Sequence, residues 1–428
     1  MTHVMEAWNT KQTYRLGKNL EQVNSIGAVT HHPPFLLDHH ILRELGLNYQ
    51  PSQHRRTCSF LFPIFKQVFA MAQEYLDIQL NARVHEKQFE VDDNIISQLP
   101  AGAVVKSCRG HGASNWNETA RLEIEVNGEP KSYFLKLTEG ERGGPMLHGE
   151  FESMRMINSL VPNNCPKPLS WGQCANPSLH YLLFSFHELK KGPPDVDRMS
   201  QLVANFHTES VKENPTGKWG FHMTTYNGPL AQDNSWTDTW EESWIRGMKR
   251  LFEYEKAARG PSEELEQLIE PYFEKVCPRL LRPLETNGRH ITPVLIHGDL
   301  WLGNMAVEAE TGDPFIFDAA SLWGHNEYEL SYMRPIASDW GTNYVDAYHK
   351  LIPKAEPQKD WDARNALYAT YVSMVLPNVA MLIHISSRVV VVDSAIYPEH
   401  EHFRTILIDE IRKLVEQFPD GYVEEEHV

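Results

Sequence analysis

The sequence predicts an α+β fold with two lobes, a small β-rich N-terminal lobe and a larger helical C-terminal lobe, preceded by an N-terminal extension. Between residues 91 and 189, short apolar or alternating runs are separated by glycine, asparagine and proline, as is typical of strands and turns. From residue 190 to residue 428, apolar residues recur mainly at helical spacing. Residues 1–90 fit neither lobe. We therefore expect three segments, with boundaries near residues 90 and 189.

Length, charge and cysteine usage limit the class of protein. The 428 residues suffice for a large core, and 41% apolar and 23% charged residues are typical of a globular protein. The 40 Lys and Arg residues against 57 Asp and Glu residues give a net charge of -17, which argues against a protein that coats nucleic acid. The five cysteines lack metal-ligand spacing, and we find neither a signal-peptide core nor an apolar run of about 20 residues. We expect a cytoplasmic protein with reduced thiols and no membrane partner.

The extension carries two features, each with more than one interpretation. The histidine-rich segment 31–40 could hold a metal ion, but no further ligand spacing completes a site, so a surface loop is preferred. One amphipathic helix is predicted from apolar residues at helical spacing, namely Leu61, Phe65, Val68, Phe69, Ala72 and Leu76. This helix could pack against the main body or against a second subunit, so both a monomer and a homodimer stay open.

The N-terminal lobe is predicted to begin with three strands and a glycine-containing loop. The order is strand Val104–Cys108, loop Gly110-His-Gly112-Ala-Ser114, strand 121–126, turn Asn127-Gly128 and strand 133–137. Such a loop can fold over nucleotide phosphates with its backbone N–H groups as donors, although a lone Gly-x-Gly is more often only a turn. Oxidation of Cys108 could regulate such a site, but a small buried strand residue is the preferred interpretation.

Lys136 is the first residue along the chain that suggests chemistry. In the strand 133–137 its side chain shares a face with Phe134, and a lysine among apolar residues needs an anionic partner or a route to solvent. Helical spacing over residues 146–161 places Glu150 on the apolar stripe, whereas Glu152 lies off it. We expect Glu150 to pair with Lys136 and to hold it on nucleotide phosphates. A surface lysine at a strand edge is the alternative.

Two later segments could contact ligands. The apolar run 181–186 predicts a buried strand, and the connector His187-Glu188-Leu189 could offer backbone groups to an adenine ring, although an ordinary loop fits equally well. Helices are predicted at 199–209, 240–256 and 263–281. The stretch between the first two is rich in aromatic and amide groups and suggests a ligand-facing surface that includes His222, Asn234 and Trp236. Core packing remains the default for each tryptophan taken alone.

Residues 294–318 carry the residue types that phosphoryl transfer needs. The apolar run Val294–Ile296 precedes the turn His297-Gly-Asp299-Leu-Trp301-Leu-Gly-Asn304, and a second apolar run ends in Asp318. The two runs predict two strands that present acids at one edge. One carboxylate can orient and deprotonate a hydroxyl, and two further oxygen ligands can hold Mg²⁺. A lone His-Gly-Asp is usually a turn, whereas the ordered set Asp299, Asn304 and Asp318 is much more specific.

Together these segments resemble the fructosamine/ketosamine-3-kinase family, which has the protein-kinase-like fold of aminoglycoside phosphotransferases. The resemblance covers about residues 91–418. It rests on residues 297–304, Phe317-Asp-Ala-Ala-Ser321, Gly324-His-Asn-Glu-Tyr-Glu-Leu330 and Lys218-Trp-Gly-Phe-His222, which Asn234 and Trp236 continue. The tryptophan after Asp-Leu and the Gly-His-x-Glu-x-Glu-Leu run distinguish this family from choline and antibiotic kinases, which share only the His-x-Asp core.

The resemblance implies a role for each candidate residue. Asp299 would be the catalytic base, Asn304 and Asp318 would hold Mg²⁺, and Lys136 with Glu150 would fix the phosphates of ATP. The implied reaction phosphorylates the 3-hydroxyl of a fructosamine or ribulosamine, free or on a protein lysine, after which the unstable product loses its sugar and early glycation is reversed. The implied substrate-facing residues are Trp301, Trp236, Asn234, His222 and Glu329.

Three departures from the family pattern leave the acceptor open. The loop after Gly112 is longer and more polar than the family's glycine-rich turn, Met333-Arg-Pro-Ile-Ala replaces its Phe-Gly-Gly-Phe, and residues 1–90 have no counterpart. A kinase of another small-molecule hydroxyl is the main alternative, and an inactive kinase-like binding module is a second. An ordinary protein kinase is disfavoured because the Asp-Phe-Gly and Ala-Pro-Glu segments are absent from the sequence.

Overall fold

The computed structural model describes residues 87–112, 116–190, 192–334, 340–370, 391–399 and 401–424. The chain divides into two compact units, Met1–Leu76 and Asp77–Val428, and every described residue belongs to the second. The histidine-rich segment and the amphipathic helix expected before residue 77 lie outside the described residues, as does Ser114.

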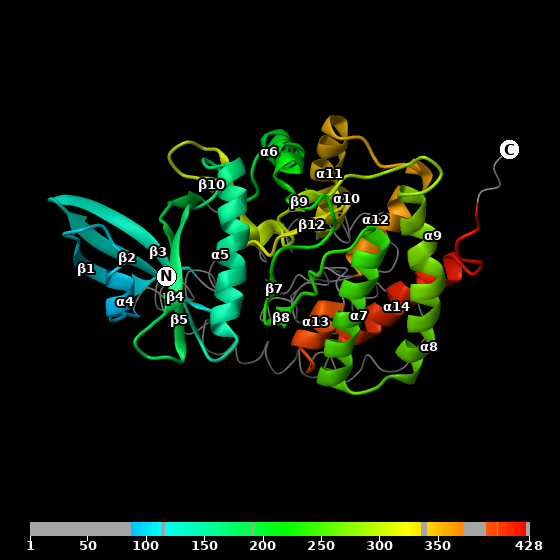
Figure 1. The fold of residues 1–428 in the computed structure, drawn as a ribbon, viewed down its shortest axis with the longest axis horizontal. Coiled ribbons are helices and arrows are strands. Elements are labelled where there is room, and N and C mark those ends of the chain that lie inside the picture. The colour runs from blue at the N-terminus through cyan, green and yellow to red at the C-terminus, as the bar shows by residue number, and fades with distance from the viewer. Residues whose placement is uncertain are drawn as a thin grey trace, which may run out of the picture. The chain divides into compact units, whose positions relative to one another are not determined.

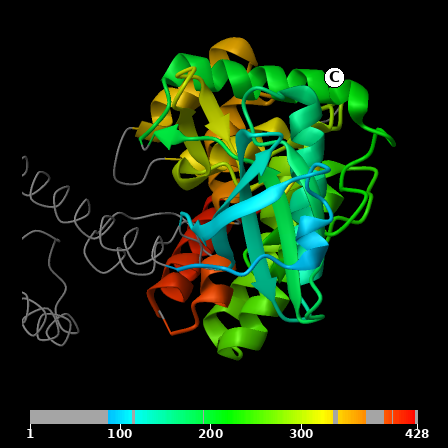
Figure 2. The same ribbon diagram turned by 90° about the vertical axis from the view of Figure 1, so that its left-hand side faces the viewer.

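The N-terminal lobe is an antiparallel sheet of five strands in the order β1-β2-β3-β5-β4 (Figure 1). The strands are β1 (Val104–Gly110), β2 (Glu118–Val126), β3 (Glu129–Glu139), β4 (Pro168–Gln173) and β5 (Leu179–Ser185). Figure 2 shows these strands in front of the helices of the C-terminal lobe. The sequence pattern did not predict β4, because Pro168 and Gly172 weaken the strand signal.

Helix α5 (Gly143–Leu160) joins the sheet to the rest of the molecule. It stands between the sheet and the helical lobe in Figure 1. Its buried residues Leu147, Met154 and Ile157 belong to the same hydrophobic core as strand β5 and the helices of the C-terminal lobe. The opposite face of the sheet has its own core, which includes Leu122 and Leu135. Helix α5 is therefore packed as a member of the C-terminal core as well as of the N-terminal lobe.

The C-terminal lobe is mainly helical, as expected. Its helices are α6 (Val196–Ser210), α7 (Trp240–Arg259), α8 (Glu263–Pro271), α9 (Cys277–Leu281), α10 (Asn326–Glu329), α11 (Trp340–Leu351), α12 (Trp361–Ala369), α13 (Val391–Ile396) and α14 (Glu401–Gln417). The expected helix 263–281 is interrupted by a π-helical turn at Tyr272–Val276, where Pro271 and Pro278 each lack a backbone N–H donor. None of the helices described combines the length and apolar character needed to cross a membrane.

The two strands expected around the polar turn exist, but they belong to different sheets. Strand β9 (Val294–Ile296) pairs with β12 (Leu322–Gly324), whereas β11 (Pro314–Ile316) pairs with β10 (Met305–Glu308). Strand β10 also pairs with β6 (Leu189–Lys190), and a separate hairpin is formed by β7 (Tyr226–Asn227) and β8 (Leu230–Ala231). The expectation of one shared edge was therefore wrong, because the chain reverses between β9 and β11 through β10.

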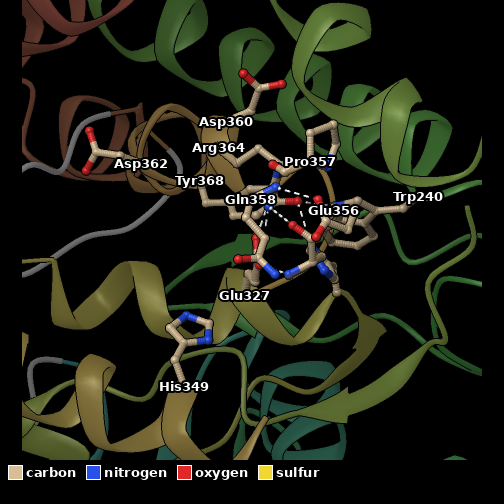
Figure 3. A network of polar contacts seen from close by, with 12 residues as sticks. Trp240, Glu327, His349, Glu356, Pro357, Gln358, Asp360, Asp362, Arg364 and Tyr368 are labelled. Atoms are coloured by element: carbon tan, nitrogen blue, oxygen red, sulfur yellow. Dashed lines mark hydrogen bonds and ion pairs between the residues drawn. The ribbon is translucent and has the colours of Figure 1, made fainter. Parts of the chain in front are cut away.

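A buried ion pair between Glu327 and Arg364 ties α10 to α12 (Figure 3). The Arg364 side chain is fully buried, and its Nε lies 3.1 Å from Oε2 of Glu327. The same guanidinium donates to the carbonyl oxygens of Pro357 at 2.9 Å and Ala355 at 2.8 Å. The N–H of Ala355 donates in turn to Oε1 of Glu327 at 2.7 Å. Both buried charges are thus satisfied by each other and by the backbone.

Breaking this pair should be costly. We expect Arg364→Met to destabilise the protein by about 3–5 kcal/mol, because the Glu327 carboxylate would stay buried without its counter-charge. Arg282→Met is the matched control, since Arg282 pairs with Glu241 while 44% of its side chain is exposed, and it should cost no more than about 1 kcal/mol. Urea denaturation followed by circular dichroism would compare the two midpoints. Equal losses in the two variants would contradict the prediction.

Candidate active site

The loop between β9 and β10 carries Asp299 and Asn304, which contact each other directly. Nδ2 of Asn304 donates to Oδ2 of Asp299 and to the Asp299 carbonyl oxygen, both at 2.8 Å. Oδ1 of Asn304 is the atom that can bind a cation, because the amide NH₂ group is a donor only. The N–H of Phe317 donates to the Asn304 carbonyl oxygen at 3.2 Å. This bond places Asp318, the next residue in the chain, beside the loop.

The loop crosses residues 317–321, the Asp318 segment, at Gly298. Gly298 has φ +77°, and a Cβ placed there would collide with the carbonyl oxygen of Ala320. The Ala320 N–H donates to the His297 carbonyl oxygen at 2.9 Å, and the His297 ring nitrogen Nε2 lies 3.0 Å from the Phe317 carbonyl oxygen. The glycine of the His-Gly-Asp motif is therefore required both by backbone conformation and by close backbone approach.

The buried Glu329 side chain holds this loop through two hydrogen bonds. Its carboxylate accepts the N–H of His297 through Oε2 and the N–H of Gly298 through Oε1, the latter at 3.2 Å. The Gly298 carbonyl oxygen accepts the hydroxyl of Tyr332. The Glu329 side chain is 0% exposed. The expected substrate-facing position of Glu329 was therefore wrong, because the carboxylate is enclosed and already committed to backbone donors.

Lys136 joins the two lobes at the site. Its Nζ, on β3, lies 2.7 Å from Oε1 of Glu150 on α5 and 2.6 Å from Oδ1 of Asp318. Burial alone would lower the pKa of Lys136, but Asp318 and Glu150 outweigh it and the pKa is raised. Burial raises the pKa of Glu150 to about 7, against the opposing effect of Lys136 and with a further rise from Asp318. The Lys136 ammonium thus pairs with two carboxylates and stays charged, while partial burial raises the proton affinity of Glu150, whose side chain is 13% exposed.

The raised pKa of Glu150 predicts that its hold on Lys136, and with it the nucleotide affinity expected from the sequence, weakens as the pH falls from 8 to 6. A protonated Glu150 lacks the negative charge that attracts Lys136, so their contact weakens. Between pH 4.5 and about 7, the Glu150 carboxyl binds a proton more readily in the native protein than in the unfolded chain. The contribution of Glu150 to folding stability therefore falls as pH rises through that window, so affinity and stability should move in opposite directions.

Calorimetric titration with a magnesium–nucleotide complex across this pH range, paired with thermal unfolding, would measure both quantities. Glu150→Gln should remove the pH dependence on the acid side while leaving histidine titrations in place. An acid-side loss of the same size in Glu150→Gln would assign the effect to another group.

The connector 187–189 is more ordered than a plain loop. The Glu188 carbonyl oxygen accepts the Ala309 N–H at 2.8 Å, and its carboxylate accepts Nη1 of Arg121 at 2.6 Å. Leu189 lies in β6 and pairs with Glu308. Nε2 of His187 lies 3.0 Å from the Ser185 hydroxyl, and burial lowers the pKa of His187. An adenine ring at this connector would therefore share the Glu188 carbonyl oxygen with Ala309 or use the other backbone groups of residues 187–189.

The glycine-containing loop differs from the expectation at its first residue. Gly110 is the last residue of β1, and its N–H donates to the Lys87 carbonyl oxygen at 2.8 Å. That N–H cannot serve a phosphate, so the expected role of Gly110 was wrong. Gly112 lies in the turn with φ +76°, a conformation that favours glycine. Cys108 is buried, and burial raises its pKa to about 11, which supports the structural interpretation of this thiol over the regulatory one.

Of the expected substrate-facing residues, Asn234 is buried, whereas Trp236 and Trp301 are only partly buried. Asn234 is buried, with Nδ2 donating to the Thr225 hydroxyl at 2.7 Å and the Met223 carbonyl oxygen at 3.1 Å, so its expected position was wrong. The Nε2 atom of His222 lies 3.4 Å from a carboxylate oxygen of Glu152, a residue of α5. Trp236 and Trp301 are partly buried against the main core.

Trp301 is the best placed of the aromatic candidates, because it lies two residues after Asp299 in the same loop. Its ring covers the Cα of Gly303 so closely that a Cβ there would collide with the ring.

Sequence reasoning missed the residues that hold the site from within, including Tyr332, Ser153, Thr225 and Gln232. Single buried Ser, Thr and Tyr side chains leave no periodic signal that could have identified them.

Comparisons with known proteins agree with this geometry. Residues 96–390 match the family model described as fructosamine kinase. The ketosamine-3-kinase of Mus musculus is 34% identical over 268 residues, which cover 58% of this chain and 80% of the mouse protein. The protein-ribulosamine 3-kinase of Arabidopsis thaliana is 28% identical over 250 residues, covering 56% of this chain and 68% of the plant protein.

A solved structure shows the same fold. A Haemophilus somnus protein described as a fructosamine-3-kinase superposes with a TM-score of 0.56 at 17% identity, covering 78% of this chain and 99% of that one. At this identity the likeness concerns the fold alone, and it confirms the expected kinase-like architecture. The family model, in contrast, spans well over half of the sequence, and the chain belongs to the fructosamine kinase family.

Proposed function

We propose that this protein is an ATP- and Mg²⁺-dependent kinase that phosphorylates a hydroxyl of a ketosamine, either a fructosamine or a ribulosamine, free or bound to a protein. The observation that carries the proposal is the convergence of Asp299, Asn304 and Asp318 with the Lys136–Glu150 pair at one place between the lobes. Membership of the fructosamine kinase family supports the acceptor class, as do the names of the mouse and Arabidopsis relatives, a ketosamine-3-kinase and a protein-ribulosamine 3-kinase.

The residues present fit a magnesium ion that is shared with a nucleotide. Oδ1 of Asn304 and the carboxylate of Asp318 offer two oxygen ligands, and Asp318 already faces a cation, the Lys136 ammonium. Mg²⁺ usually takes only one or two protein carboxylates and completes its coordination with phosphate oxygens and water. When bound, the ion would neutralise charge on the transferred phosphoryl group. Among the described residues no three His, Cys, Asp or Glu side chains gather as a metal site, which fits this sparse protein contribution.

The chain's own residues would then act in sequence. Asp299, held by Asn304, accepts the proton of the acceptor hydroxyl while the hydroxyl oxygen attacks the γ-phosphorus of ATP and ADP leaves. Lys136, held by Glu150, positions the phosphates. Trp301 offers an aromatic face beside Asp299 on which the C–H surface of a sugar can stack. The four described cysteines are free thiols, as is usual in a reducing compartment.

The test is ADP release with defined acceptors. Wild-type protein with ATP and Mg²⁺ should release ADP on addition of fructosyl-lysine or ribulosyl-lysine, and mass spectrometry should show one added phosphate on the sugar. Chelation of Mg²⁺ should abolish the reaction. Stimulation by choline or an aminoglycoside instead would keep the kinase and replace the acceptor. A protein that binds no nucleotide would contradict the whole proposal.

A further inference from the structure

On either side of Glu150, helix α5 contacts the backbone of the C-terminal lobe through Gly149 and Ser153. A Cβ at Gly149 would lie 2.9 Å from the Thr224 carbonyl oxygen and 3.2 Å from Cα of Thr225, so the helix and this backbone are in direct contact. Three residues after Glu150, the fully buried Ser153 uses its hydroxyl twice. It donates to the Gly149 carbonyl oxygen at 2.8 Å and accepts the Ser321 N–H at 3.1 Å.

The Asp318 segment is held from the other side by a buried polar cluster. The Thr225 hydroxyl donates to the Ser321 carbonyl oxygen at 3.2 Å and accepts Nε2 of Gln232 at 3.0 Å and Nδ2 of Asn234 at 2.7 Å. Nε2 of Gln232 also lies 3.1 Å from the Ala320 carbonyl oxygen. Ala320 and Ser321 follow Asp318 directly in the chain. The segment is therefore fixed between helix α5 and the residues that flank the β7–β8 hairpin.

These contacts bear on both acids that hold Lys136. Gly149 and Ser153 fix the part of α5 that carries Glu150, and the Ser153–Ser321 hydrogen bond links that part of the helix to the segment that carries Asp318. We infer that Gly149 and Ser153 are positioning residues, which lock α5 to the Asp318 segment and so hold Glu150 and Asp318 on the Lys136 ammonium. Helix α5 is then fixed in the nucleotide-binding position by the fold itself, without an activating event.

The inference rests on the proposed function for the role of Lys136 in nucleotide binding, and it makes an unusual prediction at Gly149. Replacing a helical glycine with alanine ordinarily stabilises a helix. At Gly149 the added methyl group would meet backbone atoms that cannot rotate away, so the helix must move off the hairpin. Ser153→Ala makes the complementary change, since it removes one oxygen, adds nothing and leaves the buried Ser321 N–H without this acceptor.

The experiment compares these two variants with matched controls in the full chain. Gly247→Ala places the same methyl group on helix α7, where nothing lies within 4 Å of the added Cβ. Ser159→Ala removes a hydroxyl from α5 that donates to the Met156 carbonyl oxygen at 2.7 Å and lies on the exposed side. Isothermal titration with Mg²⁺ and a non-hydrolysable ATP analogue gives the dissociation constant and the number of binding sites without any acceptor.

We expect Gly149→Ala and Ser153→Ala each to weaken binding about fivefold or more, which corresponds to the loss of roughly one buried hydrogen bond, while both controls stay within about twofold of wild type. A purely structural role would lower the number of binding sites and leave the dissociation constant unchanged. An unchanged dissociation constant in folded Ser153→Ala would overturn the inference alone, even where Gly149→Ala fails to fold. Absence of binding by the wild type would overturn the proposed function and the inference with it.

Discussion

Asp299→Asn should lower kcat for ketosamine phosphorylation on the order of 10³-fold, because a positioned general base contributes about 10²–10⁴-fold. The substitution keeps the shape of the side chain and an oxygen that can accept the Asn304 amide hydrogen bond. It removes the negative charge that takes the proton from the attacking hydroxyl. Nucleotide binding should change little, because Lys136, Glu150 and Asp318 form their contacts independently of Asp299. The measurement is steady-state ADP release paired with nucleotide titration.

Asp238→Asn is the control for this substitution. The Asp238 side chain is 79% exposed and pairs with Lys218 at the surface, so the same chemical change should leave kcat within about twofold of wild type. If Asp299→Asn retained more than about a tenth of wild-type kcat, the residue would orient the acceptor rather than deprotonate it. A loss of nucleotide affinity as large as the loss of kcat would instead indicate a collapsed loop.

The sequence was most informative where side-chain periodicity and chemistry point the same way. Lys136 on an apolar strand and Glu150 on an apolar helical stripe each needed a partner of opposite charge. In the structure, Nζ of Lys136 lies 2.7 Å from Oε1 of Glu150. Asp299 and Asn304 were singled out by spacing within one short loop, where few conformations are possible. In these cases local geometry limits what the side chains can reach, so the pattern alone narrows the answer.

The sequence was least informative where a polar residue is buried. Asn234 and Glu329 have the residue types of a ligand-binding surface, yet both are enclosed and hydrogen-bonded to the protein itself. Residue type shows which hydrogen bonds a side chain can form, but only the three-dimensional packing shows whether its partner is a ligand or the backbone. The pairing of β9 with β12 rather than with β11 is likewise set by long-range contacts.

The segment Gly324–Leu330 shows why a motif typical of the family need not touch the substrate. His325 places Nδ1 2.9 Å from the Tyr368 hydroxyl, which also accepts Nε1 of Trp240 at 2.8 Å. Glu327 pairs with Arg364, and Glu329 holds the loop that carries Asp299. Each polar residue of the segment thus connects a different part of the C-terminal lobe to α10. Of these three residues, Glu329 alone contacts the loop that carries Asp299, and the other two join helices of the C-terminal lobe.

That support can be tested at Glu329. Glu329→Gln should lower kcat about 10²-fold, because one of its two acceptor oxygens becomes an NH₂ group directed at a backbone N–H of the loop. Two donors facing each other in a fully buried site must separate, and a displacement of about 1 Å at Asp299 is enough for a loss of this size. The dissociation constant for the magnesium–nucleotide complex should stay near wild type, since the Lys136 contacts lie on other segments.

Glu327→Gln is the control, because it alters a buried carboxylate on the same short helix whose partner is Arg364 rather than the loop. It should lower the unfolding midpoint while the folded enzyme keeps kcat within about threefold of wild type, as its loss acts on stability. Thermal unfolding and kcat per folded molecule separate the two effects. A kcat loss shared equally by both variants would place the effect in the stability of α10 as a whole. A loss confined to Glu329→Gln would assign it to the two hydrogen bonds that set the position of the Asp299 backbone.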